Sequence, residues 1–360
     1  MIDFRYHLVS LIAVFLALAL GIVLGAGPLN ETLGNQLTGQ VEELREDRDR
    51  LRTELEVSEQ ETQYRDEFID EVAPATLGSR LEGRAVAVVV LPAANEDDVA
   101  DVRLRLEQAG AVVTGQVQVT EAWTDPDSAA FRSSFAGQIL GYLDPAPADG
   151  SDAGVILGAA LGQALTRGDV DGAPSTDAET LLELLVSADD PLVEVVDEPE
   201  QVANATVVVA PRTEETGPEE TPAPADVETR EQRLTEEVAL ARGLAASGEG
   251  TVVAGSAATA LDLVSVIRED GTAAETVTTT DSVSEVTGRL SVPMALAVAI
   301  SGEVGHYGVG SGATAAVPPA VYLPPPAPPE PEDNPGMGEP TGTEGQEDAD
   351  AADDETADAA

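Results

Sequence analysis

Cysteine and lysine are absent from this chain of 360 residues, and all 18 of its basic residues are arginine. Without cysteine the chain can form no disulfide, no thiolate metal site and no cysteine nucleophile. Without lysine it can form no Walker A loop, because that loop needs a lysine to reach the phosphates. The glycine fingerprint of dinucleotide-binding proteins and the nucleophile elbow of serine hydrolases are also missing.

Positive charge is scarce throughout. The chain has 67 acidic residues and a net charge of −49 at pH 7. A surface of this sign repels a phosphate backbone, so nucleic acid is excluded as a partner, and docking on anionic lipid is disfavoured. The charge fits either a solvated surface suited to a salty exterior or a surface that attracts cations.

Histidine and aromatic residues are few, with two histidines and 3% aromatics. A core must therefore be built from alanine, valine and leucine. Copper prefers imidazole, thioether or thiolate ligands, but the available donors are scattered along the sequence. These donors are Met1, His7, Met294, His306 and Met337.

The longest apolar run covers residues 8–24 and has no charged side chain. As a helix it would span about 26 Å, close to the ~30 Å hydrocarbon core of a bilayer. A cleaved signal peptide and a buried helix are the alternatives, but the run is long for a signal and a proline follows it, which favours an uncleaved anchor over residues 1–28. Arg5 precedes the run, so the N-terminus is expected inside and the bulk of the chain outside. The anchor residues are Leu8, Leu11, Phe15, Leu18, Ile22 and Leu24.

Residues 29–73 combine many charges with an apolar seam of heptad spacing. About three good heptads predict a short coiled-coil stalk, and hence a homo-oligomer; a lone charged amphipathic helix is the alternative. Forty-odd helical residues would make a stalk of about 60 Å. Pro74 is expected to stop the helix. The seam residues are Leu37, Val41, Leu44, Leu51 and Leu55.

Residues 80–316 alternate short valine-rich runs with helical patterns, which predicts an extracytoplasmic α/β domain with a doubly wound, mainly parallel sheet. The expected strands are residues 84–91, 111–119, 206–210, 251–254 and 275–279. The expected helices are residues 97–109, 128–142, 153–165, 178–187, 227–246, 257–267 and 284–300.

Residues 317–360 are of low complexity, rich first in proline and then in acidic residues. The last forty residues hold twelve acids and no base, so they cannot bury enough apolar surface to form a core. We predict a disordered acidic tail.

Glycine recurs in residues 305–312, which read GHYGVGSG. Such a run indicates unusual backbone angles or close approaches between segments. His306 lies within it and has two possible roles: it makes ordinary hydrogen bonds in a turn, or it is a metal ligand or pore-facing group. A Ser-His-Asp triad would also have to use His306, because His7 lies beside the apolar run.

Several stretches resemble the copper transport protein B family (MctB) of actinobacteria. They are the opening MIDFRYHLVSLIAVFLALALGIVLGAGPL, the segments VVVLPAANEDDV, LEQAGAVVTGQVQVTEAW and TTDSVSEVTGRLSVPMALA, and GHYG at 305–308. The resemblance covers about residues 1–316. It implies an envelope protein of copper homeostasis that forms a channel in the outer membrane, with a copper ion as transported substrate and no cofactor.

Three functions remain open at this point. A copper transporter, channel-forming or associated with efflux, is the function that the resemblance implies. A single span cannot make a pore alone, since a pore needs several helices or a closed barrel, so any channel must be an oligomer. A membrane-anchored oligomeric scaffold without transport activity is the second reading. A hydrolase-like enzyme that depends on His306 is the third, and the absence of enzyme motifs disfavours it.

Overall fold

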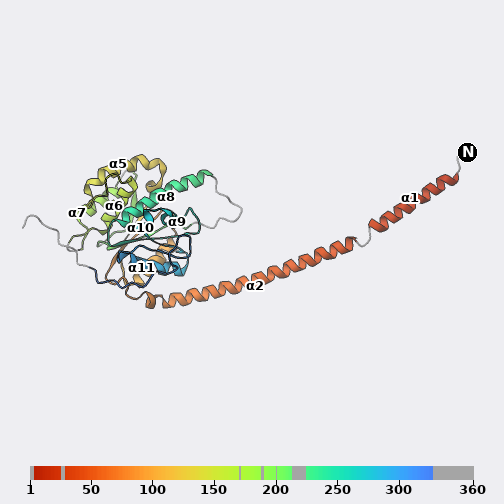
Figure 1. Ribbon diagram of the computed structural model, residues 1–360, viewed down its shortest axis with the longest axis horizontal. Coiled ribbons are helices and arrows are strands. Elements are labelled where there is room, and N and C mark those ends of the chain that lie inside the picture. Colours follow the sequence, from red (N-terminus) through yellow and green to blue (C-terminus); the bar gives the residue numbers. More distant parts are fainter. Residues whose placement is uncertain are drawn as a thin grey trace, which may run out of the picture. The chain divides into compact units, whose positions relative to one another are not determined.

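The chain divides into two compact units, Met1–Thr76 and Leu77–Ala360 (Figure 1). The computed structural model describes residues 4–25, 29–169, 172–187, 190–199, 201–212 and 224–326, without the side chains of Leu24 and of residues 29–38. An apolar N-terminal helix and a mostly parallel sheet confirm the predicted α/β class. Of the predicted tail, residues 317–326 contain no helix or strand, and residues 327–360 lie outside the described part.

The first unit consists of two helices, α1 (Phe4–Gly25) and α2 (Leu29–Leu77). Within the described residues, the segment Phe4–Val23 is the one helix long and apolar enough to cross a membrane. The helix α2 runs through Pro74, which corrects the expectation that this proline stops it. A proline removes one helical hydrogen bond, and so close to a helix end that loss is small enough for the last turn to form.

The second unit is built on one seven-stranded sheet of order β3-β2-β1-β4-β5-β6-β7. The strand β3 is antiparallel to β2, and the other pairs are parallel. The chain leaves β1 toward β2 on one side, and β4 toward β5 on the other, which is the doubly wound arrangement. The strands are β1 (Ala85–Val90), β2 (Val112–Val119), β3 (Val193–Asp197), β4 (Ala205–Val209), β5 (Gly250–Ala254), β6 (Thr278–Thr280) and β7 (His306–Tyr307).

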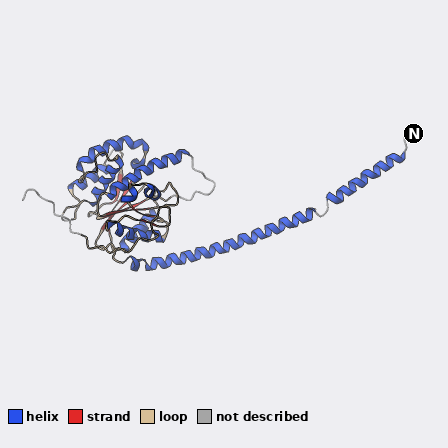
Figure 2. Ribbon diagram, viewed as in Figure 1, coloured by secondary structure: helices blue, strands red, loops and turns tan. Residues whose placement is uncertain are grey.

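Helices cover both faces of this sheet (Figure 2). The helices α3 (Glu96–Gln108) and α11 (Val286–Ile300) pack on one face. The other face carries α4 (Glu121–Thr124), α5 (Ala129–Ile139), α6 (Ala153–Thr166), α7 (Thr176–Val186), α8 (Pro224–Ala245), α9 (Leu263–Glu269) and α10 (Ala273–Thr276). Short 3-10 turns at Pro126–Ser128 and Leu140–Tyr142 flank α5.

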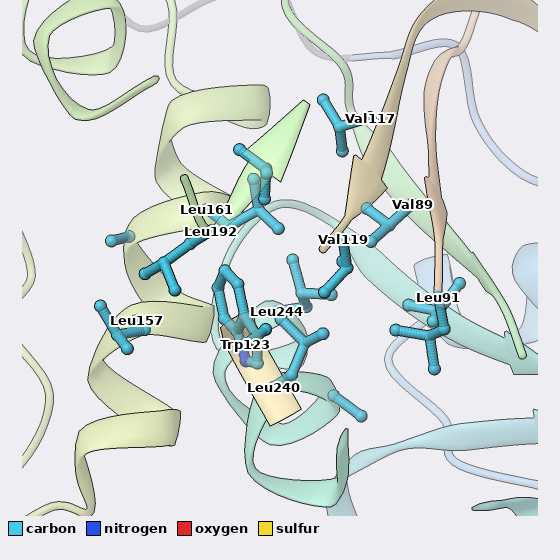
Figure 3. Packing of buried hydrophobic residues seen from close by; sticks show 14 of the residues in the cluster. Val89, Leu91, Val117, Val119, Trp123, Leu157, Leu161, Leu192, Leu240 and Leu244 are labelled. Atoms are coloured by element: carbon cyan, nitrogen blue, oxygen red, sulfur yellow. The ribbon is translucent and has the colours of Figure 1, made fainter. Parts of the chain in front are cut away.

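The central strand β1 shows how the sequence builds two cores. Successive side chains of a strand point to opposite faces, so Val88 joins the cluster under α3 and α11 while Val89 joins the cluster under α6 and α8. In Figure 3, Trp123 lies within the second cluster, among leucines of α6 and α8. Trp123 is the only tryptophan in the sequence and is fully buried, so its fluorescence reports on this core.

Small residues let α6 and α8 approach closely. A Cβ added at Gly158 of α6 would lie 2.6 Å from the carbonyl oxygen of Leu240 in α8. A Cβ added at Gly243 of α8 would lie 2.4 Å from the carbonyl oxygen of Val155. The backbones therefore touch, and this contact holds α6 and α8 together over the central strands.

Local hydrogen bonds explain two errors in the predicted elements. The helix expected at 257–267 begins only at Leu263, because the Asp262 carboxylate accepts from Thr259 N and Ser256 Oγ and so holds a turn there. The strand expected at 275–279 is instead the helix α10 followed by β6, since Asp270 Oδ1 accepts from Ala273 N and starts a helical turn.

The close approach of α6 and α8 gives a stability prediction. Gly158→Ala is expected to lower the free energy of unfolding by about 1–3 kcal/mol, because the new methyl group must push the backbones apart. Gly137→Ala in α5 is the matched control: nothing lies within 4 Å of its added Cβ, so this change should stabilise by about 0.5 kcal/mol. Urea denaturation followed by Trp123 fluorescence measures both, and equal effects of the two variants would contradict the packing argument.

Candidate functional site

The glycine-rich segment and Asp281 meet at the carboxyl edge of the sheet. Asp281 directly follows β6, and residues 308–312 directly follow the neighbouring strand β7. Parallel strands end at the same edge, so two segments that lie nearly thirty residues apart in the sequence become neighbours. We call Arg268, Thr279, Asp281, His306 and the loop 308–312 the edge cluster.

A buried ion pair forms the centre of the edge cluster. Arg268 Nη1 of α9 lies 2.7 Å from Asp281 Oδ2, and both side chains are only 1% exposed. The same guanidinium donates to Tyr307 O at 2.8 Å and to Ser311 O at 3.1 Å. The charge of Arg268 is thereby matched, and this one side chain joins α9 to β6, to β7 and to the glycine loop.

The glycine loop wraps around the Asp281 carboxylate. The backbone N–H groups of Val309 and Gly310 each donate to it at 3.0 Å. Gly308 has a φ of +127°, and a Cβ there would lie 2.0 Å from Asp281 Oδ1, so both its angle and its space require glycine. Burial raises the pKa of the Asp281 carboxyl, but these hydrogen bonds and the neighbouring Arg268 hold that pKa below its usual value.

His306 uses both ring nitrogens inside the protein. Its Nε2 lies 3.1 Å from Ala274 O, a carbonyl that can only accept, so this nitrogen carries the hydrogen. Its Nδ1 lies 2.9 Å from Thr279 Oγ1, and that hydroxyl accepts from Arg268 Nε at 3.0 Å. With the hydroxyl hydrogen directed to Nδ1 the ring is a neutral imidazole, which is the form that burial and the nearby Arg268 cation favour by lowering the pKa of His306. Binding of a metal by His306 would have to displace one of these bonds, and this assignment stays a prediction.

A second ionic cluster lies between β1 and β4, at the point where the order of the strands in the sheet reverses. The loops after β1 and β4 flank this reversal, the usual place for ligands in doubly wound folds. Asp98 at the start of α3 is 1% exposed and lies 3.3 Å from Arg212 Nε and 3.8 Å from Arg289 Nη2. Burial raises the pKa of Asp98, although both arginines oppose this. Sequence reasoning treated the two loops separately and missed this cluster, because only the parallel pairing of β1 and β4 brings them together.

A groove of about 650 Å³ lies between α3 and the strands β2 and β3. Its walls include Arg103 and Leu104 of α3, Gln116 and Gln118 of β2, and Val196 of β3. Arg103 is already bonded to Gln116 Oε1 at 2.8 Å and to Asp197 Oδ2 at 2.5 Å. The groove therefore offers amide and guanidinium groups and the carboxylates of Glu96 and Glu107, but no soft metal donor.

The predicted anchor and seam residues lie on α1 and α2. The side chains of Leu8, Leu11, Phe15, Leu18 and Ile22 are all exposed, as a lipid-facing helix requires. The seam residues Val41, Leu44, Leu51 and Leu55 are also exposed. Leu24 and Leu37 fall among the side chains that are not described.

The donor set of the molecule bears on what it could bind. Across the described ranges, no group of three or more His, Asp or Glu side chains is placed to hold a metal ion. In the edge cluster the side chains of Arg268, Asp281 and His306 are all bonded to groups of the protein itself. These bonds stabilise the carboxyl edge of the sheet. The helix α1, in contrast, has the length and composition of a membrane span.

These features define a mixed α/β protein with one N-terminal helix of membrane-spanning length. The family model described as "Copper transport outer membrane protein, MctB" matches residues 1–318. Relatives named "Copper transporter MctB" include one from Mycobacterium tuberculosis (strain ATCC 25618 / H37Rv), 33% identical over 87% of this chain and 98% of the relative. Another, from Mycobacterium leprae (strain TN), is 32% identical over the same shares of the two chains. The chain belongs to the MctB family, as its resemblance predicted.

The buried ion pair gives a second stability prediction. Asp281→Ala leaves the Arg268 cation buried without its partner, so we expect a loss of about 3–5 kcal/mol in the free energy of unfolding. Asp197→Ala removes the partner of Arg103 in a half-exposed pair and should cost at most about 1 kcal/mol. Denaturation by urea compares the variants, and a loss at Asp281 no greater than at Asp197 would refute the role of the pair.

The environment of His306 predicts a pH dependence. Burial lowers the pKa of His306, and the nearby Arg268 cation lowers it further, against the effect of the Ala274 carbonyl. The unfolded chain therefore binds a proton here first, at about pH 6.5, and stability is lost as the pH falls below that value, by at most ~1.4 kcal/mol per pH unit. His306→Gln removes this contribution, whereas all other titrating groups are common to both proteins.

Urea denaturation of both proteins at several values between pH 7.5 and pH 5 measures the effect. The stability advantage of the native chain over the His306→Gln variant should shrink as the pH falls. An advantage that stays constant over this range would show that the imidazole is not held in its neutral form.

Proposed function

We propose that this chain serves copper homeostasis from the cell envelope, with α1 as an uncleaved anchor and the α/β unit on the extracytoplasmic side. The observation that carries the proposal is α1, an apolar helix of 22 residues with exposed side chains, in a chain whose relatives are named copper transporters. The description of the family places it in the outer membrane, and we extend that location to this chain.

Within this role we propose that the chain is associated with copper efflux rather than a complete channel by itself. One spanning helix leaves no lumen, and an aqueous path through lipid needs several helices or a closed barrel. The seven-stranded sheet has helices on both faces, so its strands are buried as in a water-soluble protein. A channel would therefore need several copies of α1 or a different partner protein.

Copper is then the substrate of the transport process and not a resident metal. The sequence has no cysteine, and both nitrogens of His306 are engaged. Copper(I) favours thiolate and thioether ligands, which this chain hardly supplies. The acidic surface can attract cations without selecting among them.

An anchored scaffold without transport activity is the alternative. The observation that favours it is the edge cluster, where the Asp281 carboxylate and the Arg268 guanidinium are bonded to groups of the protein itself. Bonds of this kind hold the carboxyl edge of the sheet together and engage both charged side chains. The MctB family is described as one of copper transport proteins and is not a known enzyme family, so we propose no enzymatic function.

Cell copper under copper stress tests the proposed function. A strain that lacks the gene should accumulate copper, and the full chain should restore a low level. A form in which a cleavable signal replaces α1, so that residues 29–360 are exported but released, should fail to restore it. The His306→Gln variant should restore it fully, because the imidazole is a structural group in this proposal.

Unchanged copper in the deletion strain would reject the copper role and favour the scaffold. Conductance of the purified full chain in planar bilayers is the companion measurement. We expect no channels from the chain alone, whereas reproducible copper-permeable channels would replace the efflux-associated role by that of an oligomeric pore.

A further inference from the structure

The helix α2 carries an apolar row that no described residue of the chain covers. Four aliphatic side chains of this helix are 45–67% exposed and follow one another after three, seven and four residues: Val41, Leu44, Leu51 and Leu55. Such spacing places them on one stripe of the helix, with Val41 and Leu55 at a positions and Leu44 and Leu51 at d positions of a heptad. A stripe of exposed aliphatic side chains in a highly charged helix indicates a surface that binds a matching helix.

Charges beside the stripe indicate which helix would match. In this register Gln40, Asp47 and Glu54 occupy g positions, and Arg45 and Arg52 occupy e positions. In a parallel pair of helices, each g residue lies beside the e residue five positions later in the partner. Asp47 then faces Arg52 of the partner subunit, and Gln40 faces Arg45 of the partner subunit. A second copy of α2 therefore complements the first.

The arginines at the e positions are the ones available for such pairs. Arg48 is bonded to Asp49 at 2.6 Å, Arg50 to Asp47 at 2.9 Å, and Arg65 to the carbonyl oxygen of Glu61 at 3.1 Å. The side chains of Arg45 and Arg52 make no ion pair or hydrogen bond with any described residue of the chain. Their guanidinium groups are thus free to reach across an interface.

The opposite orientation is unfavourable. An antiparallel pair places g positions beside g positions, so Asp47, Glu54 and Glu61 would face one another and repel. Parallel packing is also the orientation available to two chains whose N-terminal helices enter one membrane. Val41 at an a position with leucines at d favours two strands, and the charged Arg48 at the next a position restricts register.

The same pattern limits how far the pairing extends. After Leu55 the seam becomes polar, with Ser58, Thr62 and Arg65 at its next positions. The flanking pairs change sign as well, because Glu54 would face Glu59 of the partner subunit. Two helices held together before Leu55 therefore lose both apolar contact and charge attraction beyond it.

We propose that α2 pairs with α2 of a second copy of this chain as a parallel, two-stranded coil over residues 41–55, held in register by ion pairs between Asp47 and Arg52 of the partner subunit. The proposal does not depend on copper: a chain without any role in copper could form the same dimer.

Cross-linking of the full chain in detergent tests the orientation. The sequence has no cysteine, so one introduced cysteine is the only thiol present. Leu44→Cys and Leu51→Cys should each give disulfide-linked dimers under mild oxidation, because equal d positions face each other in a parallel pair. Thr53→Cys, on the outer face of the same helix, is the matched control and should stay mainly monomeric.

Cross-linking at only one of the two d positions would indicate antiparallel packing, and cross-linking as strong at Thr53 would indicate no defined interface. Either result overturns the proposal. Light scattering of the unmodified chain in detergent gives the protein mass of the assembly, and a mass other than that of two chains overturns the two-stranded state.

Charge exchange tests the ion pairs. Arg52→Asp should raise the dimer dissociation constant about tenfold, because two attractive pairs become repulsive. The double change Asp47→Arg and Arg52→Asp should restore it. Arg50→Asp, the same charge change on the outer face, controls for loss of intrahelical pairs. Equal weakening by Arg50→Asp, or no recovery in the double variant, would refute the proposed register.

Discussion

The buried ion pair between Arg268 and Asp281 is the interaction on which the carboxyl edge of this sheet depends. It joins α9 to the ends of two short strands, since β6 has three residues and β7 has two. Strands this short have too few ladder hydrogen bonds to fix their own positions. A guanidinium with fixed donor geometry adds to those bonds, since it donates to a side chain of β6, to the carboxylate that follows this strand and to two backbone carbonyls. The glycine loop then encloses the carboxylate, and the positive φ of Gly308 makes that possible.

The two units use the same residues in opposite ways. In the α/β unit, aliphatic side chains of β1 and β4 alternate between two dry cores, and α6 and α8 approach until their glycines touch backbone. In the helical unit, leucines and valines stay exposed along α1 and α2. Exposed aliphatic residues need a solvent or a partner that covers them. A bilayer suits the continuous apolar surface of α1, and a second helix suits the narrow stripe of α2.

Periodic patterns in the sequence predicted the regular parts of the fold. The runs at 84–91 and 206–210 became β1 and β4, and the helix expected at 153–165 became α6 with one more residue. The strand β3 was missed because its acidic residues interrupt the apolar pattern, and β7 because two residues carry no period. The sequence marked Asp281, His306 and the glycines separately as features of one family. It could not reveal that Arg268 joins them, since an arginine in an amphipathic helix looks like any solvated charge.

The two edges of the sheet also decide how the protein behaves when many copies are crowded together. An open strand edge invites pairing with another molecule and so promotes aggregation. On one side β3 ends the sheet with an antiparallel strand that carries the exposed Glu194, and like charges on two such edges repel. On the other side the chain returns after β7, and Ala315 forms a β-bridge with Tyr307. This segment of the same chain covers part of the β7 edge. In the membrane-anchored form that we propose, the chain would reach a high local concentration, and these two edges would let α/β units lie close together without joining into a common sheet.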